Sequence, residues 1–395
     1  MIIPYYFTKK NFGENAASYI DIANNFMRKI SSVFNNSKFK YFIKKILLKM
    51  IMTIGVKNFK KILLFLPTFL YIILARSILN RNLSNLLFQA RSSNLYIDLE
   101  NVKKNYKKPK RFDKIKDTNK PIKIDIIIPV HNALEYTALC LRSVFKYATN
   151  NDIIKTNVII IDDYSDEHTS KYLDEQAKKF KNWKVIHNNK NLGFVRSCNK
   201  GMSESSADII VLLNSDTIIT TDFCEKIANC FLSDNKIGVA SPLATASPNA
   251  AIPMLPGYNV FQMAELIDYL SERKYPEFVT CEGFCFCISK ECINKIGLFD
   301  EIYCNGYGGE ESDYSLLALK HGFRTVLIDD LYIYHKRHAT FGKKKRDELY
   351  KGNKKIFMDR WADFYKEKYT EHMNPPPFNY INKKIKYIKK NLKNV

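Results

Sequence analysis

Short apolar runs and amphipathic segments alternate through the middle of the chain. Continuous runs of Val, Ile and Leu predict buried strands, and apolar residues spaced three or four positions apart predict helices. The predicted strands are 123–128, 157–161, 184–187, 209–213, 237–240, 279–288 and 325–334, and the predicted helices are 135–148, 168–180, 194–204, 222–232 and 310–321. Strands of this kind separated by helices indicate an α/β fold with a mostly parallel sheet covered on both faces.

The N-terminal part of the chain has a different pattern. Residues 36–91 alternate basic and apolar positions and contain the apolar run 62–75, which is shorter than the ~20 residues of a membrane-spanning helix. This run is compatible with a transmembrane helix, a helix lying on a membrane surface, or a helix packed on the main domain. Residues 100–121 are polar and rich in Lys and Pro, which predicts a linker. We therefore expect a basic, helical N-terminal region with its linker at 1–121.

The main domain is expected at 122–342, and residues 343–395 are expected to form a basic helical extension. Trp361 and Phe364 are spaced to face one side of a helix. Near the end of the chain, apolar residues recur at helical spacing among lysines from Tyr380 onward, which predicts a basic amphipathic helix. A frayed, solvated tail is the alternative for this last stretch.

The net charge of +22 is confined to the two flanks. Residues 1–121 contain 24 Lys and Arg against 6 Asp and Glu, and residues 343–395 contain 16 against 6. The middle carries 22 against 28 and is acidic. A nucleic-acid enzyme would carry its basic surface around its active site. The charge pattern therefore argues against a nucleic-acid partner and favours contact of the flanks with an anionic membrane surface.

The nine cysteines are scattered through apolar stretches, and the first residues lack the basic and apolar regions of a secretory signal. This predicts a reducing compartment, the cytoplasm, with the protein peripheral on the inner face of the cell membrane. Four of the cysteines lie close enough in sequence to suggest zinc, namely Cys281, Cys285, Cys287 and Cys292. Their apolar surroundings favour buried thiols instead.

Polar residues follow three of the predicted strands directly. The first strand leads into Pro129-Val130-His131-Asn132, the second into Asp162-Asp163-Tyr164-Ser165, and the fourth into Asn214-Ser215-Asp216-Thr217. In a parallel sheet these strand ends meet in one crevice, where ligands bind. A carboxylate there can accept hydrogen bonds from a base or ribose, or hold a metal. Each motif alone is also common turn or helix-cap chemistry.

Taken together and in this order, the motifs resemble those of family 2 glycosyltransferases with the GT-A fold, of the bacterial cell-surface polysaccharide type. The resemblance includes the strand ends above, Asn191-Leu192-Gly193-Phe194, Gly297-Leu298-Phe299-Asp300-Glu301, Glu310-Glu311-Ser312-Asp313 and Tyr334-His335. It covers roughly 122–342. It implies an inverting, metal-dependent enzyme that moves a sugar from a nucleotide-diphosphate sugar to a hydroxyl of a glycan or lipid-linked acceptor, as in capsule or lipopolysaccharide synthesis.

The resemblance implies roles for individual residues. Asp216 and His335 would hold a divalent ion, Mg²⁺ or Mn²⁺, with His338 as a substitute for His335. Asn214 stands where the family has its first metal-motif Asp, so ribose binding suits it better than metal coordination. The nucleotide-sugar would contact residues along the strand ends and the helix after Gly193, namely Pro129, His131, Asn132, Asp163, Arg196, Asn214 and Ser215.

The acidic motif at 310–313 would supply the catalytic base. An acceptor hydroxyl is a poor nucleophile until a base removes its proton. Residue-by-residue matching assigns the base to Glu311, with Glu310 and Asp313 as the other catalytic candidates. The competing explanation is that an acidic first turn simply complements the helix macrodipole.

Other functions fit the sequence less well. No G-x-G-x-x-G follows the first strand, which disfavours a nicotinamide-dependent dehydrogenase. A sugar nucleotidyltransferase would have a glycine-rich basic loop at that position. From a different class, the chain could be a membrane-surface or nucleic-acid-binding protein with a degenerate glycosyltransferase core.

Overall fold

The computed structural model describes residues 100, 102–103, 118, 120–255, 258–304, 307–336 and 343–391. All of them belong to a compact unit, Ile78–Val395. The apolar run 62–75 and His338 lie outside the described residues. Within the predicted linker, Val102 is buried, and the Lys103 Nζ atom lies 2.6 Å from the Glu265 carboxylate.

One eight-stranded sheet runs through the described part of the chain, in the order β3-β2-β1-β4-β7-β6-β8-β5. Its strands are β1 (Ile122–Val130), β2 (Ile154–Asp162), β3 (Trp183–His187), β4 (Ile209–Leu213), β5 (Thr217–Ile218), β6 (Ile237–Ala244), β7 (Cys285–Ser289) and β8 (Arg324–His335). The first four strands in this order are parallel, as are β6 and β8, whereas β7 and β5 run antiparallel to their neighbours. The predicted α/β fold with a mostly parallel sheet is confirmed.

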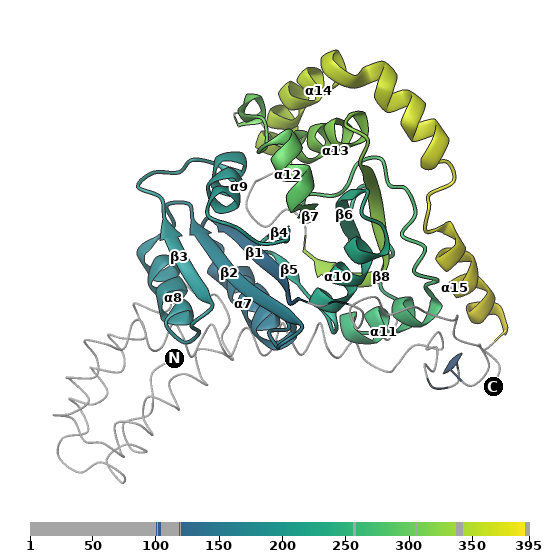
Figure 1. The fold of residues 1–395 in the computed structure, drawn as a ribbon, viewed down its shortest axis with the longest axis horizontal. Coiled ribbons are helices and arrows are strands. Elements are labelled where there is room, and N and C mark those ends of the chain that lie inside the picture. The colour runs from purple at the N-terminus through teal and green to yellow at the C-terminus, as the bar shows by residue number, and fades with distance from the viewer. Residues whose placement is uncertain are drawn as a thin grey trace, which may run out of the picture. The chain divides into compact units, whose positions relative to one another are not determined.

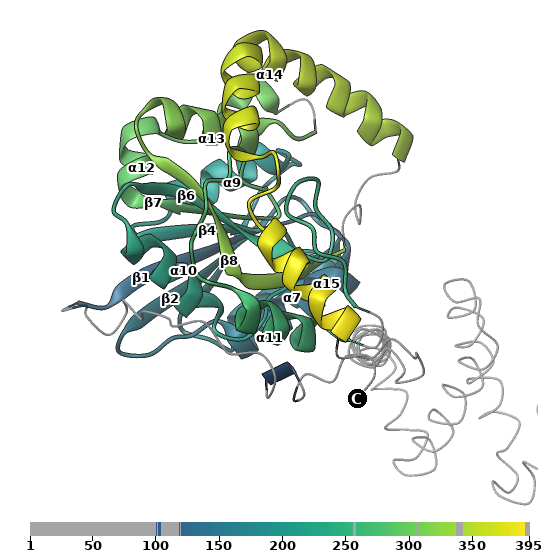
Figure 2. The ribbon, with the colours of Figure 1, turned by 90° about the vertical axis from the view of Figure 1, so that its right-hand side faces the viewer.

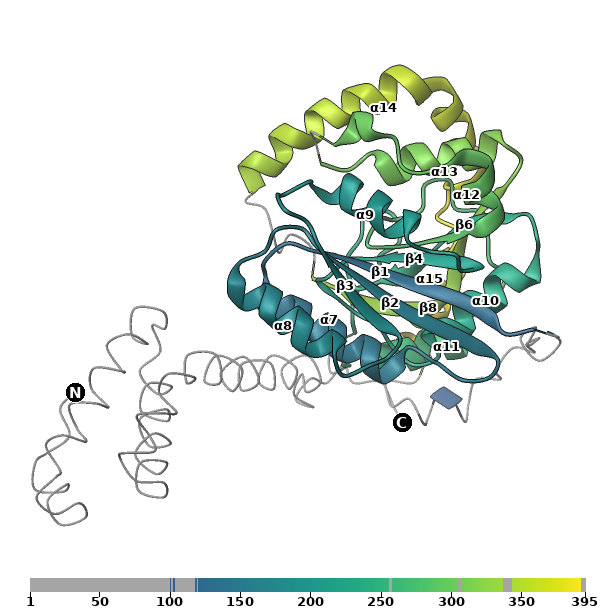
Figure 3. The same cartoon turned by 60° about the vertical axis from the view of Figure 1, so that its left-hand side comes forward.

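Helices cover both faces of the sheet because its strands are apolar on both sides (Figures 1 and 3). On one face the core contains Ile126 and Ile128 of β1 together with residues of α7 (Leu134–Tyr147), α8 (Glu167–Ala177) and α10 (Phe223–Ser233). On the other face, Ile127 joins a core that includes residues of α9 (Phe194–Ser203), α11 (Val260–Leu270), α12 (Lys290–Ile296) and α13 (Glu310–Lys320). Successive residues of β1 thus point into opposite cores.

The structure departs from the predicted elements in one functionally important place. A strand is predicted over 279–288, but β7 begins only at Cys285. The preceding residues turn instead, and the amide of Cys285 donates to the carbonyl oxygen of Glu282 at 3.3 Å. The two-residue β5 and the helices α11 and α12 are also absent from the predicted elements.

The basic C-terminal stretch forms two helices, α14 (Lys343–His372) and α15 (Asn379–Asn391), which lie over the side of the core that contains α13 and α11 (Figure 2). Trp361 of α14 and Ile381, Ile385 and Ile388 of α15 are buried in that core. The predicted amphipathic helix is therefore present, and its apolar side packs against the protein. Its outward side carries lysines, and the exposed fraction of Tyr387 there is 63%.

None of the helices in the described ranges is both long and apolar enough to cross a membrane. All nine cysteines fall within those ranges and are free thiols. The four clustered in sequence are buried in the apolar cores, as predicted.

Candidate active site

The turn Asn214-Ser215-Asp216 lies between β4 and the short strand β5. The amide and the hydroxyl of Thr217 both donate to the carbonyl oxygen of Asn214, at 3.3 and 2.8 Å. Thr217 pairs with His335 at the end of β8, and the amide of Lys336 donates to the Asp216 carbonyl oxygen at 3.0 Å. This pairing brings the two predicted metal ligands together, although 119 positions separate them in the sequence.

The Asp216 Oδ1 and His335 Nε2 atoms lie 3.5 Å apart, and both side chains are almost buried. The other ring nitrogen of His335, Nδ1, is 3.0 Å from the Ala246 carbonyl oxygen. Because a carbonyl oxygen only accepts hydrogen bonds, Nδ1 carries the proton, and in the neutral ring Nε2 presents a lone pair to the Asp216 carboxylate. Two acceptors that face each other are suited to sharing a cation.

Further protein ligands are not apparent: in the described ranges no three His, Cys, Asp or Glu side chains gather in a way that could hold a metal ion. Asp216 and His335 would supply two protein ligands to a divalent ion at this position. Water and phosphate oxygens are the usual partners of Mg²⁺ in such open sites. The donor set thus fits an ion that is completed by a bound diphosphate.

Asp163, at the end of β2, is buried and holds the loop that leads into α9. Its carboxylate accepts hydrogen bonds from the amides of Leu192 and Gly193, at 2.7 and 2.9 Å, and from the Asn188 side chain, at 2.9 Å. Gly193 has a φ of 82°, which favours glycine at this position. The Asp163 carboxylate therefore orders the loop around the predicted base pocket.

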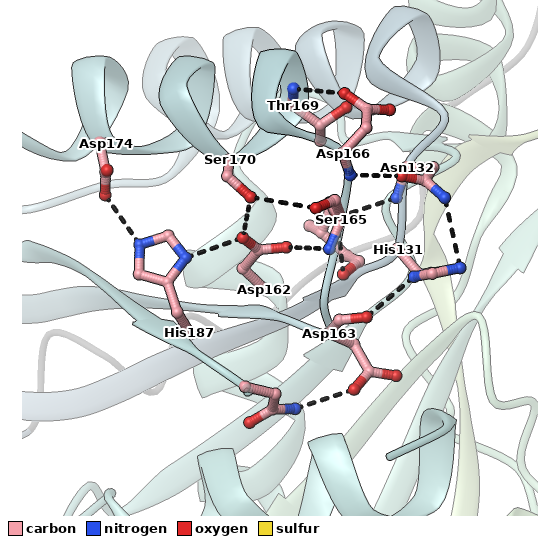
Figure 4. Close-up of polar contacts among 12 residues, drawn as sticks. His131, Asn132, Asp162, Asp163, Ser165, Asp166, Thr169, Ser170, Asp174 and His187 are labelled. Carbon is pink, nitrogen blue, oxygen red and sulfur yellow. Dashed lines mark hydrogen bonds and ion pairs between the residues drawn. The ribbon is translucent and has the colours of Figure 1, made fainter. Parts of the chain in front are cut away.

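The turn after β1 is joined to the same region (Figure 4). The Nδ1 atom of His131 lies 2.8 Å from the Asp163 carbonyl oxygen. The amide of Asn132 donates to the Ser165 hydroxyl at 2.9 Å, and its side-chain oxygen accepts from the Asp166 amide at 2.7 Å. Asn132 adopts a φ of 58°, a conformation that Asn tolerates better than most residues. The predicted donor residues His131, Asn132 and Asp163 thus form one connected group.

Behind this group, His187 bridges two acidic residues (Figure 4). Its ring nitrogens lie 2.8 Å from the Asp162 carboxylate and 3.0 Å from that of Asp174. Partial burial opposes the charged form, but these two hydrogen bonds raise the pKa of His187 above its ordinary value. Burial likewise opposes charge on Asp162, yet hydrogen bonds from Ser170, Ser165 and His187 keep its pKa low. Nothing in the sequence pattern predicts these ion pairs of His187 with Asp162 and Asp174.

Glu310 and Glu311 lie next to each other in the first turn of α13 and are called the acid pair below. Glu310 is buried, Glu311 is half-buried, and the Gly309 amide donates to the Glu311 carboxylate at 3.2 Å. Burial raises the pKa of both, and the neighbouring charge of Glu311 raises that of Glu310 further. The Glu310 side chain in turn lowers the pKa of Glu311 and offsets part of the effect of burial. Of the two, Glu310 therefore has the more strongly raised pKa and holds its proton more tightly.

Asp313 differs from the pair in its contacts. Its Oδ1 atom accepts three hydrogen bonds, from the Tyr303 hydroxyl at 3.0 Å, Arg360 Nη1 at 2.8 Å and Trp361 Nε1 at 2.7 Å. The residue is almost completely buried. Its carboxylate thus joins α13 to α14.

Arg196, predicted to contact the nucleotide-sugar, lies on the outer surface of α9. Its Nε atom is 2.9 Å from the Glu301 carboxylate, and both side chains are about half exposed. A surface ion pair of this kind exchanges readily with solvent or other anions.

The turn before β7 joins the metal corner, which is formed by Asn214, Asp216 and His335, to the acid pair. The carbonyl oxygen of Phe284 accepts a hydrogen bond from the Asn214 amide at 2.9 Å, and its ring stacks on that of His335 with centroids 4.9 Å apart. A Cβ atom on the adjacent Gly283 would lie 3.5 Å from the Glu311 side chain. The strand predicted over 279–288 concealed this turn, and no local sequence signal identifies Phe284.

A buried thiol on α9 connects the acid pair to the donor group. Burial raises the pKa of Cys198, and the charges of Glu310, Glu311 and Asp163 raise it further. The contacts of Phe284 with Asn214 and His335, and of Gly283 with Glu311, join the metal corner to the acid pair.

Comparisons with known proteins agree with this arrangement. Residues 125–297 match Glycosyl transferase family 2. The matched segment is similar to this family and contains the sheet strands from β4 to β7 together with the turn at Asn214–Asp216. Over 105 residues it is 31% identical to the putative glycosyltransferase EpsH of Bacillus subtilis, covering 26% of this chain and 29% of that protein.

A longer match, 25% identical over 269 residues, is to human polypeptide N-acetylgalactosaminyltransferase 3 and covers 61% of this chain and 41% of that one. The matched segments thus span less than half of either relative. Among solved structures, a mannosyltransferase from Pyrobaculum calidifontis, in complex with GDP-Man and Mn²⁺, aligns with a TM-score of 0.43 at 17% identity, over 61% of this chain and 64% of that one. Staphylococcus aureus TarS aligns at 0.43 and 15%, over 63% and 74%.

Proposed function

We propose that this protein is an inverting glycosyltransferase that moves a sugar from a nucleotide-diphosphate sugar to a hydroxyl group of a glycan or lipid-linked acceptor. The observation that carries the proposal is the turn at Gly283 and Phe284. It contacts Asn214 and His335 on the metal side and Glu311 on the acid side. A leaving diphosphate and an acceptor hydroxyl need these two kinds of group close together.

In this proposal Asp216 and His335 would hold a divalent ion, Mg²⁺ or Mn²⁺, which when bound would stabilise the negative charge that develops on the leaving nucleoside diphosphate. Asn214 is a neutral and weaker ligand, and we assign it to the ribose together with Ser215. The support for this assignment is the facing pair of acceptor atoms, 3.5 Å apart.

We assign the nucleobase to the group that contains Asp163, His131 and Asn132, with Pro129 at the end of β1. Hydrogen bonds from loop amides fix the Asp163 carboxylate in place before any ligand binds. A preformed pocket loses less entropy on binding. Arg196 would reach the donor phosphates only by leaving Glu301.

Glu311 is the proposed base. Its carboxylate takes the proton of the acceptor hydroxyl while the acceptor oxygen bonds to the anomeric carbon. The bond from that carbon to the diphosphate oxygen breaks at the same time, and its electron pair leaves with the nucleoside diphosphate. One displacement inverts the anomeric configuration, so the mechanism contains no glycosyl-enzyme intermediate. Asp313 is not assigned to proton transfer because three donors hold its Oδ1 atom.

The charge of the two flanks supports a proposal for the class of acceptor and for the location of the protein. Residues 1–121 and 343–395 carry the basic charge of the chain. The outward side of α15 presents the exposed lysines Lys383, Lys386 and Lys390, which suit an anionic lipid surface. We therefore propose a peripheral position on the inner face of the cell membrane and a role in making a cell-envelope polysaccharide.

A donor screen tests the proposal. Uridine, thymidine and guanosine diphosphate sugars would be added to the full-length protein with Mn²⁺ or Mg²⁺, and thermal unfolding and release of the nucleoside diphosphate would be measured. Ligand at 100 times its Kd stabilises a protein by about 2.7 kcal/mol. We expect one nucleotide class to raise the Tm in a metal-dependent manner. Absence of a metal-dependent shift with every donor would contradict the proposal.

A further inference from the structure

One side chain of α14 holds both ends of the loop that precedes the acid pair. The Asn353 Nδ2 atom donates to the carbonyl oxygen of Tyr303 at 3.0 Å and to that of Gly308 at 2.7 Å. Asn353 is 3% exposed, so these hydrogen bonds are shielded from water. Gly309, directly after this loop, has a φ of 104° and donates its amide to Glu311. The start of α13 therefore depends on where α14 lies.

A second contact lies two turns further along α14. Arg360 donates to Asp313 on α13, at 2.8 Å, and to Asp300, at 2.9 Å. The Trp361 indole nitrogen donates to the same Asp313 oxygen at 2.7 Å. Residues seven and eight positions apart lie on one side of a helix, so a single side of α14 makes all of these contacts.

All residues that take part in these contacts of α14 lie after residue 297, where the segment that matches the family ends. α14 binds the chain on both sides of the acid pair. Before the pair it binds the carbonyl oxygens of Tyr303 and Gly308, and after the pair it binds the side chain of Asp313. Figure 1 shows α14 lying along α13. A helix from the C-terminal extension thus fixes the proposed base from two sides.

We propose that Asn353, Arg360 and Trp361 are positioning residues for the acid pair, which keep Glu311 directed at the acceptor and shield the pair from water. The proposal rests on the proposed function, in which Glu311 is the base. None of the three residues transfers a proton; they act by holding residues 300–304 and 307–313 against α14.

The first test needs no substrate. Hydrogen–deuterium exchange of the full-length Arg360→Gln variant would be compared with wild type and with Lys355→Gln, a control on the exposed side of α14. We expect faster exchange in 300–313 of Arg360→Gln alone, with β1 and β4 unchanged. Unchanged exchange in 300–313, or an equal increase in β1 and β4, would overturn the proposal. Asn353→Ala serves as a second variant if Arg360→Gln does not fold.

The second test uses steady-state transfer as a function of pH. The charge of Glu310 affects the thiols Cys198 and Cys304, and the nearby Asp313 is bound by Tyr303 and Arg360. We expect an unchanged KM for the donor, a kcat reduced roughly 10- to 100-fold by misplacement of the base, and an acid limb of the profile displaced to lower pH. Burial raises the pKa of Glu311, and water that reaches the acid pair reduces this effect. The pKa of Glu311 therefore falls, and the acid limb moves with it.

The two tests separate the two proposals. A general loss of stability would lower the amount of active enzyme without moving the acid limb, and that result would overturn the positioning role. If wild type binds no donor and transfers no sugar, the proposed function fails, whereas the exchange experiment still decides whether α14 holds residues 300–313.

Discussion

The Nε2 atom of His335 lies 3.5 Å from the Oδ1 atom of Asp216, and the proton of the His335 ring is directed away, toward Ala246. In the tautomer with its proton on Nδ1, the ring directs the Nε2 lone pair at the Asp216 carboxylate. The arrangement is stable when a cation or a proton lies between them. This relationship links the end of β8 to the turn after β4.

Removal of one of these acceptors should abolish metal-dependent donor binding. In Asp216→Ala the remaining His335 is a single neutral ligand, so we expect no Mn²⁺-dependent rise in Tm with the donor and transfer below detection. The measurement is thermal unfolding with and without metal. Asp152→Ala, at a fully exposed aspartate, is the control and should behave like wild type. Metal-dependent binding that survived in Asp216→Ala would remove this residue from the metal site.

Glu311→Gln should separate binding from turnover. Glutamine keeps the shape of the side chain but cannot accept the acceptor proton, so kcat should fall roughly 100-fold or more. The Kd of the donor, measured by calorimetry, should stay the same. Glu291→Gln changes an exposed acid in the first turn of α12 and controls for helix-dipole effects. Transfer at a near-normal rate in Glu311→Gln would show that the base is a different group.

The acid pair should also affect stability in a pH-dependent manner. The pKa of Glu310 in the folded protein is raised above the ordinary value of 4.5, so the fold binds its proton more tightly than the unfolded chain does. Wild type therefore loses stability as the pH rises from that ordinary value toward the raised one. Glu310→Gln removes the titration. We expect equal Tm values near pH 4 and a higher Tm of the variant at pH 8, by about 2–4 °C for each kcal/mol recovered. A lower Tm of the variant at pH 8 would contradict this account of the pair.

The lysines on α15 should contribute to membrane binding without contributing to the fold. Replacing Lys383, Lys386 and Lys390 with Gln should weaken binding to anionic vesicles roughly fivefold per lysine. A variant with Gln at Lys171, Lys178 and Lys181 has the same net charge and should bind like wild type. Sedimentation with vesicles, with a DNA duplex in a parallel experiment, measures both partners. Tight, salt-sensitive binding to DNA would instead favour a nucleic-acid role.

Functional residues that directly follow a strongly apolar strand could be predicted from the sequence. The run 209–213 is apolar throughout, so β4 and the turn at Asp216 could be located directly. His335 was placed through the resemblance, but its approach to Asp216 depends on the two-residue strand β5, which is too short for any hydrophobic pattern to identify.

The acidic motif shows a second limit of sequence-based prediction. Glu310, Glu311 and Asp313 all occupy the first turn of one helix, and their order alone does not distinguish them. Asp313 differs from the two glutamates because it accepts hydrogen bonds from Arg360 and Trp361, which lie 47 and 48 positions later. Contacts over such distances depend on how α14 packs, and the spacing of Trp361 and Phe364 on one side of a predicted helix does not identify the partner of that side.

The burial of Trp361, Ile381, Ile385 and Ile388 has a practical consequence for engineering this protein. A chain shortened after β8 would open the apolar core and leave Asp313 without two of its three donors. The C-terminal helices are therefore not an interchangeable tail. Grafting the sheet and its motifs onto the C-terminal segment of a different protein requires matching partners for Asp313, Tyr303 and Gly308 as well.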